Sequence, residues 1–374
     1  MRIAFIYDRV NKLGGAERVL MALHQIWPQA DLFTSIYNPY TASWARQFKI
    51  KSSFLSKFSL FSTHHEIFFP IIPYIFESVK MDDYDVILSI TSAEAKAVIV
   101  KPGILHICYC LTPIRYLWSG YQDYFRQPGV GFLNPLVKLY MMVVFPSLRR
   151  WDYIASSRPD CYLAVSRTVA ERIKVYYRKD SEVIYPPVDI DRFKPATDQS
   201  SKDYFLIVSR LVPYKRIDYV ISTFNNLGWK LKIIGSGIDK SRLKLMAKNN
   251  IEIINGNLTD EKLCWYYQNC QALIFPGEED FGITSVEAQA CGKPVIGFKW
   301  GGVSEVIIPG ITGEIYESQD EKALTLVLKK FKHKKYYPSA CRQNAIRFAE
   351  DNFKKRMKKT VEDLWKEWKK ATGE

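Results

Sequence analysis

The chain has 374 residues, more than one hydrophobic core usually supports, so two domains are expected. Its composition of 47% hydrophobic and 25% charged residues is typical of a folded globular protein and excludes a disordered or fibrous one. A net charge of +14 at pH 7 predicts an anionic partner or simply a solvated basic surface, and the lack of zinc-finger, RNA-binding and basic-zipper patterns argues against nucleic acid.

The first residues, Met1–Asp8, combine one positive charge with a very short apolar run, which predicts a β-strand and not a secretory signal. The seven cysteines are scattered without a Cys-x-x-Cys pair, as in proteins of the reducing cytosol. The best candidate for a membrane span, Leu139–Leu148, is too short to cross a bilayer and is broken by Pro146. We therefore expect a cytoplasmic protein that crosses no membrane.

Apolar runs of strand length alternate with segments of helical periodicity along the whole chain. This rhythm predicts parallel sheets covered by helices. Consecutive prolines at Pro186 and Pro187 end regular structure and predict a stiff boundary between two sets of strands. The expected strands are 3–7, 31–35, 86–90, 105–110 and 161–165 in the first set, and 205–209, 231–234, 251–254, 272–275 and 295–298 in the second.

The predicted fold is therefore α/β, with two doubly wound Rossmann-like domains. The first covers residues 1–184 and the second covers residues 185–352. A final helix at about 353–374 has no strand to follow, so we expect it to cross back to the first domain.

Glycines follow the first strand where an anion could approach the backbone. Gly14 and Gly15 lead from that strand into a helical segment, so backbone N–H groups and the helix dipole could face a phosphate. The spacing is not Gly-x-Gly-x-x-Gly, and a tight strand-to-helix turn explains it equally well.

A basic loop follows the first strand of the second set. Arg210 and Lys215 lie on this loop, where two cations could neutralise a diphosphate leaving group in place of a metal ion. An exposed basic loop is the alternative. Gly235, after the next strand, permits a similarly close backbone approach or forms a plain turn.

The most informative segment carries two carboxylates around a helix start. Glu279 ends a loop and Glu287 lies on the first turn of a predicted helix, so both could accept hydrogen bonds from sugar or ribose hydroxyls. A surface acid is the alternative for Glu279, and a capping box with Thr284 is the alternative for Glu287. The backbone N–H groups expected to face a bound sugar and phosphate belong to Phe281, Gly282, Ile283 and Thr284.

Glu279 and Glu287 match the Glu-x7-Glu motif of retaining glycosyltransferases with the GT-B fold, and their setting resembles the O-antigen mannosyltransferase branch of glycosyltransferase family 4. The resemblance extends over roughly residues 1–364, and several ordered motifs are more specific than any one of them. The other segments that resemble the family are 14–18, 108–116, 209–215 and 301–305.

The resemblance implies a role for each residue of the second domain. Arg210 and Lys215 would bind the diphosphate oxygens. Glu287 would hold the ribose and Glu279 the hydroxyls of the transferred sugar. The backbone near Asn257 and Leu258 would meet the base.

On the first domain, the resemblance implies that Gly15 and nearby amides face the diphosphate across a cleft between the domains. Arg115 and Tyr116 would lie near the acceptor or the donor. One departure stands out, because relatives usually carry His where this chain has Leu111.

An Asp-x-Asp sequence, Asp83-Tyr84-Asp85, has the spacing by which other glycosyltransferases hold a divalent cation. It precedes a strand of the first domain, far in sequence from the basic loop. We interpret it as a turn, and predict no metal site and no cofactor besides the nucleotide-sugar substrate.

The resulting hypothesis is a metal-independent, retaining hexosyltransferase. The leading donor by resemblance is GDP-mannose, and the acceptor would be a lipid-linked oligosaccharide or polysaccharide precursor, as in lipopolysaccharide synthesis. A nucleotide-sugar epimerase or phosphorylase on the same fold and a non-catalytic glycan-binding protein are the alternatives; Leu111 is the one feature that favours the last.

Two stretches combine basic and aromatic residues in a way that favours docking on an anionic leaflet. They are Phe54–Phe76 and the C-terminal Phe353–Lys370. We therefore expect a peripheral protein at the inner face of the cytoplasmic membrane, with lipid as a partner and no nucleic acid.

Overall fold

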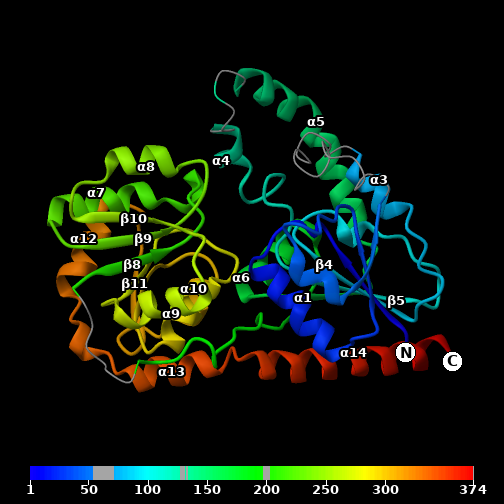
Figure 1. Cartoon of the computed structure of the whole chain (residues 1–374). Coiled ribbons are helices and arrows are strands. Elements are labelled where there is room, and N and C mark those ends of the chain that lie inside the picture. The colour runs from blue at the N-terminus through cyan, green and yellow to red at the C-terminus, as the bar shows by residue number, and fades with distance from the viewer. Residues whose placement is uncertain (54–70, 127–130, 132–133, 197–202, 374) are drawn as a thin grey trace. The chain divides into compact units, whose positions relative to one another are not determined.

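The structure is a computed structural model that describes residues 1–53, 71–126, 131, 134–196 and 203–373. It consists of two compact units. The first comprises Met1–Pro187 together with Phe353–Glu374, and the second comprises Val188–Asn352. Each unit is built on a parallel sheet with helices on both faces (Figure 1).

The sheet of the first unit has the order β3-β2-β1-β4-β5-β6-β7. All of its pairs are parallel, and Phe5 on the central strand pairs with Leu32 on one side and Leu88 on the other. Its strands are β1 (Ile3–Tyr7), β2 (Asp31–Thr34), β3 (Lys49–Ser52), β4 (Val86–Thr91), β5 (Leu105–Cys110), β6 (Cys161–Ala164) and β7 (Glu182–Val183).

Alternation along the strands feeds two cores, one on each face of this sheet. Phe5 points into a core shared with α1, α6 and α14, and Ile6 points into another shared with α3 and the end of α5. The helices of this unit are α1 (Gly15–Ile26), α3 (Ile72–Glu77), α4 (Tyr121–Arg126), α5 (Asn134–Ala155), α6 (Arg167–Tyr177) and α14 (Glu350–Thr372), with 3-10 turns η1 (Ser43–Gln47) and η4 (Ala95–Ala97).

The second unit repeats the same winding, with the strand order β10-β9-β8-β11-β12-β13. Its strands are β8 (Phe205–Val208), β9 (Leu231–Gly235), β10 (Ile251–Asn255), β11 (Leu273–Phe275), β12 (Val295–Phe298) and β13 (Gly313–Tyr316). Its helices are η6 (Pro213–Lys215), α7 (Ile217–Leu227), α8 (Lys240–Met246), α9 (Asp260–Asn269), α10 (Ile283–Ala290), α11 (Val303–Val306), α12 (Glu321–Lys330), η7 (His333–Lys335) and α13 (Pro338–Ile346).

These two sheets confirm the predicted fold class of two Rossmann-like α/β units. The ten predicted strands are all present, with ends that differ by at most one residue. Strands β3, β7 and β13 were not predicted from the sequence. The edge strand β3 reads Lys-Ile-Lys-Ser and is mostly exposed, β7 has two residues, and β13 mixes a charge with apolar residues, so none of them forms an apolar run.

The prediction that Pro146 breaks the segment around Leu139–Leu148 was wrong. Helix α5 is 22 residues long, from Asn134 to Ala155, and contains Pro146 in its interior. A proline removes the hydrogen bond to the carbonyl four residues earlier, here that of Met142. Both residues face outward, so water can satisfy that carbonyl. None of the described helices is long and apolar enough to cross a bilayer.

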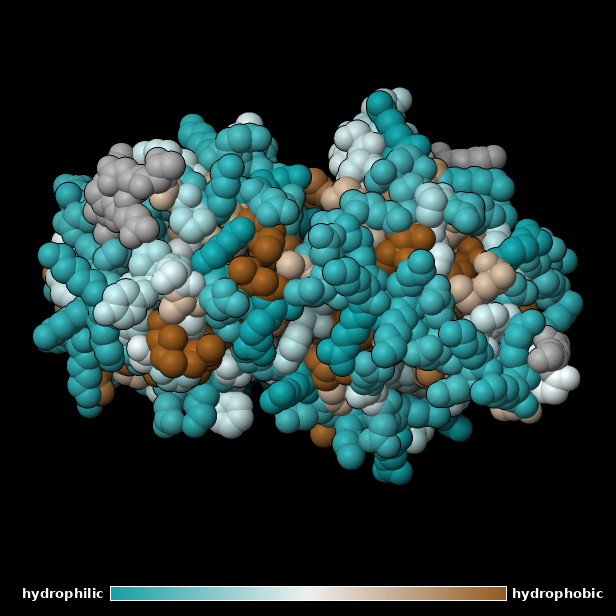
Figure 2. All heavy atoms as spheres, turned by 90° about the horizontal axis from the view of Figure 1, so that it is seen from below, coloured by the Kyte–Doolittle hydropathy of each residue, from teal (hydrophilic) through white to brown (hydrophobic). Residues whose placement is uncertain are grey.

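The C-terminal helix α14 uses its apolar face inside the protein. Phe353, Met357 and Val361 are buried in the first unit's core, and Leu364, Trp365 and Trp368 pack against it. Most lysines of α14 are exposed, namely Lys355, Lys358, Lys359, Lys366 and Lys370, and the face seen from below is mostly hydrophilic (Figure 2). The apolar residues of Phe353–Lys370 therefore hold the helix to the sheet and are not presented to a lipid leaflet.

The other predicted lipid-binding stretch, Phe54–Phe76, lies outside the described residues as far as position 70. Its remaining residues, from position 71 to 76, include most of α3. Ile72 and Phe76 of this helix are buried in the core that also contains Ile6.

If α14 is a structural part of the first unit, Met357→Ala should lower the free energy of unfolding by about 2–5 kcal/mol, because it leaves a cavity in the core. Lys355→Ala, at an exposed position of the same helix, should change it by less than about 0.5 kcal/mol. Urea unfolding of the two variants makes the comparison. Equal midpoints would show that α14 is not needed by that core.

Candidate functional site

The strand order of the second unit reverses between β8 and β11, which pair with each other. In open parallel sheets, ligands bind at the carboxyl ends of the strands at such a reversal. The loop after β8 carries Arg210 and Lys215, and the loop after β11 carries Glu279. Two loops that the sequence separates by more than sixty residues therefore meet at one point.

At this point Lys215 and Glu279 form an ion pair, with Nζ donating to Oε1. The lysine side chain is 6% exposed and the glutamate side chain 25%, so the pair is largely shielded from water on the lysine side. The loops pack closely, because a Cβ on Gly277 would lie 3.2 Å from the carbonyl oxygen of Lys215. Lys215 is thus not an exposed basic side chain, as the alternative interpretation supposed.

Two glycines, Gly301 and Gly302, contact the backbone of Glu279 and hold it in place. The Gly302 N–H donates to the Glu279 carbonyl oxygen at 2.8 Å. Gly301 has φ +96°, and a Cβ there would lie 2.6 Å from the same oxygen. Only glycine fits both the conformation and the contact. The segment 301–305 was noted in the sequence, but this positioning role was not foreseen.

Helix α10 places Glu287 at a buried position. Gly282 caps the helix with φ +92°, and Thr284 lies inside the helix, so the capping box proposed for Thr284 and Glu287 is wrong. Instead, the Tyr267 hydroxyl on α9 donates to Glu287 Oε2 at 2.8 Å. Just before the helix, the Phe281 ring packs against Phe348. Tyr267 was missed, since nothing local in its sequence marks it.

Gly235 lies at the carboxyl end of β9, beside the basic loop. A Cβ on Gly235 would lie 1.9 Å from the Ser209 carbonyl oxygen, so no other residue fits between the two strand ends. Beyond the end of β10, the Leu258 N–H donates to the Gly256 carbonyl oxygen at 2.9 Å. Asn257 and Leu258 thus follow β10 at the same carboxyl-end edge of the sheet as the loops after β8 and β9.

The charged side chains predicted for the site of the second unit therefore fall into two groups. Lys215 and Glu279 contact each other, and Arg210 shares their loop, where its guanidinium donates to the Tyr214 hydroxyl at 2.6 Å. Glu287 is held separately, through α9.

In the first unit, Gly14 and Gly15 open α1 as predicted, with Gly14 in extended conformation at the N-cap. A carboxylate of the chain itself lies at this helix start. Glu17 Oε1 accepts from the Tyr7 hydroxyl at 2.6 Å. Burial raises the pKa of this carboxyl above its usual value, although the hydrogen bonds from the Tyr7 hydroxyl and from the backbone of Glu17 and Gly14 oppose the shift. A Cβ on Gly14 would lie 3.0 Å from Glu17 Oε2. This contact supports the tight-turn interpretation of the glycines.

Tyr116 lies on the loop that follows β5 and is anchored to the sheet. Its hydroxyl donates to Glu94 Oε1 at 3.0 Å, and Arg9 pairs with the other oxygen of Glu94 at 2.8 Å. The carbonyl oxygen of the preceding residue, Arg115, accepts from the Gly120 N–H at 2.8 Å. Leu111, at the start of the loop, packs partly buried against the first unit's core.

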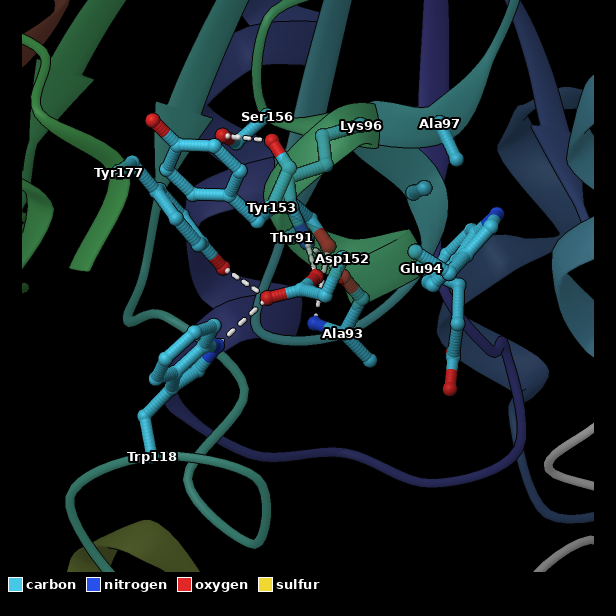
Figure 3. A network of polar contacts seen from close by, with 12 residues as sticks. Thr91, Ala93, Glu94, Lys96, Ala97, Trp118, Asp152, Tyr153, Ser156 and Tyr177 are labelled. Atoms are coloured by element: carbon cyan, nitrogen blue, oxygen red, sulfur yellow. Dashed lines mark hydrogen bonds and ion pairs between the residues drawn. The ribbon is translucent and has the colours of Figure 1, made fainter. Parts of the chain in front are cut away.

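A buried network beneath this loop was not foreseen (Figure 3). Lys96 Nζ lies 2.5 Å from Asp152 Oδ1, and both side chains are almost fully buried. Asp152 Oδ2 accepts from the Trp118 indole at 2.7 Å and from the Tyr177 hydroxyl at 2.9 Å. The pKa of Lys96 is raised in spite of its burial, because the Asp152 carboxylate stabilises the ammonium. The network ties the Trp118 loop, α5 and α6 to the sheet.

Asp83 and Asp85 form the turn before β4. The Asp85 carboxylate accepts from the backbone N–H of Arg2 at 2.6 Å. Across the part of the chain that the structure describes, no group of three or more His, Cys, Asp or Glu side chains is placed to hold a metal ion.

The match to a known protein family lies within the second unit. Residues 189–348 match the family described as glycosyl transferases group 1. That range holds the Lys215–Glu279 pair and Glu287.

Similar curated proteins are also described as sugar transferases. An uncharacterized glycosyltransferase of Methanocaldococcus jannaschii is 28% identical over 182 residues, which cover 46% of this chain and 51% of that protein. The GDP-mannose-dependent alpha-(1-6)-phosphatidylinositol monomannoside mannosyltransferase of Mycolicibacterium smegmatis is 28% identical over 171 residues, covering 38% and 45%. The chain thus matches only about half the length of these relatives.

Solved structures show the fold over nearly the whole chain. Sucrose-phosphate synthase from Thermosynechococcus elongatus aligns with a TM-score of 0.73 at 15% identity, covering 98% of this chain and 99% of that one. Anabaena HepE, solved with UDP-glucose, aligns with a TM-score of 0.71 at 16% identity, covering 97% and 100%. These structures thus share the two-domain fold of this chain.

The buried pair of the first unit gives a test of the network. Asp152→Asn keeps the shape of the side chain but leaves the Lys96 ammonium without its counterion, so the free energy of unfolding should fall by about 3–5 kcal/mol. The matched control is Asp82→Asn, which breaks the exposed Lys101–Asp82 pair and should cost less than about 1 kcal/mol. Urea denaturation compares them, and similar losses would contradict a structural role for the buried pair.

Proposed function

We propose that the protein is a glycosyltransferase that moves a sugar from a nucleoside diphosphate donor to a glycan acceptor. The observation that carries the proposal is the Lys215–Glu279 pair beside Arg210 at the β8/β11 reversal, inside the range that matches the group 1 glycosyl transferases. This is the edge of a Rossmann-like sheet where phosphates and sugars bind.

The basic loop is proposed to stabilise the leaving group. As the bond between the anomeric carbon and the diphosphate breaks, negative charge grows on the phosphate oxygens. The Arg210 guanidinium can grip two of these oxygens, and Lys215 adds a point charge, so no metal ion is required.

The pairing of Lys215 with Glu279 gives the glutamate a defined place. The ammonium fixes the orientation of Glu279, so the other carboxylate oxygen can accept a hydrogen bond from a hydroxyl of the sugar. We infer that Glu279 aligns the sugar for transfer rather than attacking it.

Glu287 is proposed to bind the ribose hydroxyls. The Tyr267 hydroxyl fixes one of its oxygens, so the carboxylate keeps a single orientation. The backbone at Asn257 and Leu258 is proposed to meet the base, and the N–H groups from Phe281 to Thr284 the sugar and phosphate.

Retention follows if the acceptor attacks on the face that the diphosphate leaves. The acceptor oxygen forms a bond to the anomeric carbon while the bond to the diphosphate oxygen breaks, and the departing phosphate accepts the proton of the acceptor hydroxyl. No side chain of the second unit's site needs to act as a nucleophile in this scheme.

Mannose from GDP-mannose is the proposed donor sugar, supported by the named activity of the Mycolicibacterium smegmatis relative. A thermal-shift panel of UDP, GDP and ADP sugars identifies the donor, because a ligand at a hundred times its Kd stabilises the folded protein by about 2.7 kcal/mol.

The acceptor is proposed to be lipid-linked, and helix α5 supports this. Leu136, Leu139, Tyr140 and Val143 follow the spacing i, i+3, i+4, i+7 on one face of α5 and are between 37% and 67% exposed. The opposite face, with Met141 and Phe145, is buried.

The charges of α5 favour an anionic lipid surface over a protein partner. The helix carries three cations, Lys138, Arg149 and Arg150, and its one acid, Asp152, is buried in the ion pair with Lys96. An apolar stripe on a helix with net positive charge and no exposed acid is typical of helices that lie in a negatively charged leaflet. Arg115 and Tyr116, whose loop packs next to α5, are the proposed acceptor-side residues.

The two glutamates should respond differently to substitution. Glu279→Gln should lower kcat by about 100-fold or more, because the sugar contact is lost. The Kd for the bare nucleotide diphosphate should stay within about twofold, because the bound diphosphate can itself neutralise the Lys215 ammonium when the ion pair with Glu279 is gone. Glu287→Gln should raise that Kd by about tenfold or more, since a charge-assisted hydrogen bond is lost. Calorimetry with UDP and GDP, and a nucleotide-release assay with and without EDTA, measure both effects.

Tyr267→Phe is the matched control for Glu287, because it removes the hydroxyl that orients the carboxylate and keeps the carboxylate itself. It should weaken nucleotide binding less than Glu287→Gln does. Nucleotide affinity that is unchanged in both glutamate variants would refute the assignments, and activity that requires added magnesium or manganese would refute the role of the basic loop.

The α5 surface predicts a lipid-charge dependence. The protein should sediment with vesicles that contain phosphatidylglycerol and not with pure phosphatidylcholine, and the binding should weaken as salt rises. Leu139→Gln with Val143→Gln should reduce it about tenfold or more, because two apolar side chains no longer enter the leaflet. Leu245→Gln, at an exposed apolar position on α8, should have no effect. Equal binding by both variants would exclude α5 as the docking surface.

A further inference from the structure

Two cysteines lie next to the proposed ribose-binding glutamate. Cys264 is on α9 and Cys291 directly follows α10, and their sulfur atoms are 3.8 Å apart. Both cysteines carry free thiols. Tyr267 and Glu287 join the same two helices, one helical turn away from the cysteines. The two helices are thus linked by two neighbouring contacts, one between thiols and one that positions Glu287.

The thiols differ in reactivity. The pKa of Cys264 is lowered to about 6, because a hydrogen bond from the Cys291 thiol stabilises the thiolate. The pKa of Cys291 is raised by burial and by the same hydrogen bond. Cys264 is also the more accessible residue, 7% exposed against 2%. One thiolate with a neighbouring thiol is the arrangement of an attacking and a resolving cysteine.

We propose that Cys264 and Cys291 form an oxidation site, at which a hydroperoxide converts the two thiols into an intrachain disulfide that fastens α9 to α10. The Cys264 thiolate attacks the O–O bond and becomes a sulfenic acid, while the alkoxide or hydroxide leaves and is protonated. The Cys291 sulfur then attacks Cys264 Sγ, and water leaves with the Cys291 proton. Two thiols and one hydroperoxide give one disulfide, one alcohol or water, and one further water.

The disulfide changes the donor site through the helix pair. The sulfur atoms must approach from 3.8 Å to about 2 Å. That movement shifts the end of α10 against α9, and the Tyr267–Glu287 hydrogen bond lies one turn away. Oxidation therefore weakens nucleotide binding; this consequence rests on the proposed role of Glu287, whereas the formation of the disulfide does not.

The first arm of the test identifies the cross-link in the full-length protein. After treatment with hydrogen peroxide and alkylation of the remaining thiols, mass spectrometry of a non-reduced digest should show a peptide pair joined through Cys264 and Cys291. Cys264→Ser and Cys291→Ser should each abolish it. Cys270→Ser should not, because Cys270 is fully buried and burial raises its pKa to about 12. No such peptide pair from the wild type, or equal linkage of Cys264 to Cys270, would overturn the site.

The second arm measures the Kd for UDP and for GDP before oxidation, after it, and after reduction with dithiothreitol. For the nucleotide that binds the reduced protein, the Kd should rise about fivefold on oxidation, as expected for one weakened hydrogen bond, and return on reduction. In the Cys291→Ser variant, peroxide should leave the Kd for this nucleotide unchanged. An unchanged Kd in fully cross-linked protein would overturn the coupling to Glu287. Failure of both nucleotides to bind the reduced protein would count against the proposed function, and the peptide result would still decide the oxidation site.

Discussion

A lysine ammonium that is almost removed from water needs a counterion, and in the second unit this requirement fixes the geometry of the site. Lys215 can be buried only because Glu279 arrives from the loop after β11. That arrival depends on the backbone at Glu279 and Asp280 lying against Gly301 and Gly302. A Cβ on Gly301 would collide with the Glu279 backbone, and a Cβ on Gly302 would collide with the Asp280 backbone. The parallel sheet brings the two loops to the same edge, and the ion pair joins them there.

The first unit meets the same requirement with different elements. Lys96 follows β4 and Asp152 is near the end of α5, and both are buried more deeply than Lys215 and Glu279. The indole of Trp118 and the hydroxyl of Tyr177 both donate to Asp152 Oδ2, whereas Oδ1 faces the Lys96 ammonium. In this way α5 is held firmly at its C-terminal end while the apolar face of its N-terminal half stays exposed. A rigid attachment suits a helix that is proposed to enter a leaflet.

The comparison of α5 with α14 shows why amphipathic patterns in a sequence do not assign a partner. Both helices combine apolar residues with cations. The apolar side of α14 covers the first unit's sheet, whereas α5 places only Met141, Phe145 and a few neighbours inside and leaves another apolar side uncovered. Periodicity predicts that an apolar face will be buried against something, and the tertiary structure decides what that is.

The sequence by itself determined the two Rossmann-like units and the strands with continuous apolar runs, because apolar periodicity and proline positions are local properties. It also placed Arg210, Lys215 and Glu279 on loops that follow strands, which is where parallel sheets hold ligands. The exposed edge strand β3 and the passage of α5 through Pro146 depend on what neighbouring elements cover, so the pattern could not show them. Only the tertiary structure decided which side chains face each other. Glu287 meets Tyr267 instead of Thr284, and Cys264 meets Cys291, because α9 and α10 pack together. Such contacts join residues twenty or more positions apart, and nothing in the chain between them records the distance that folding will leave.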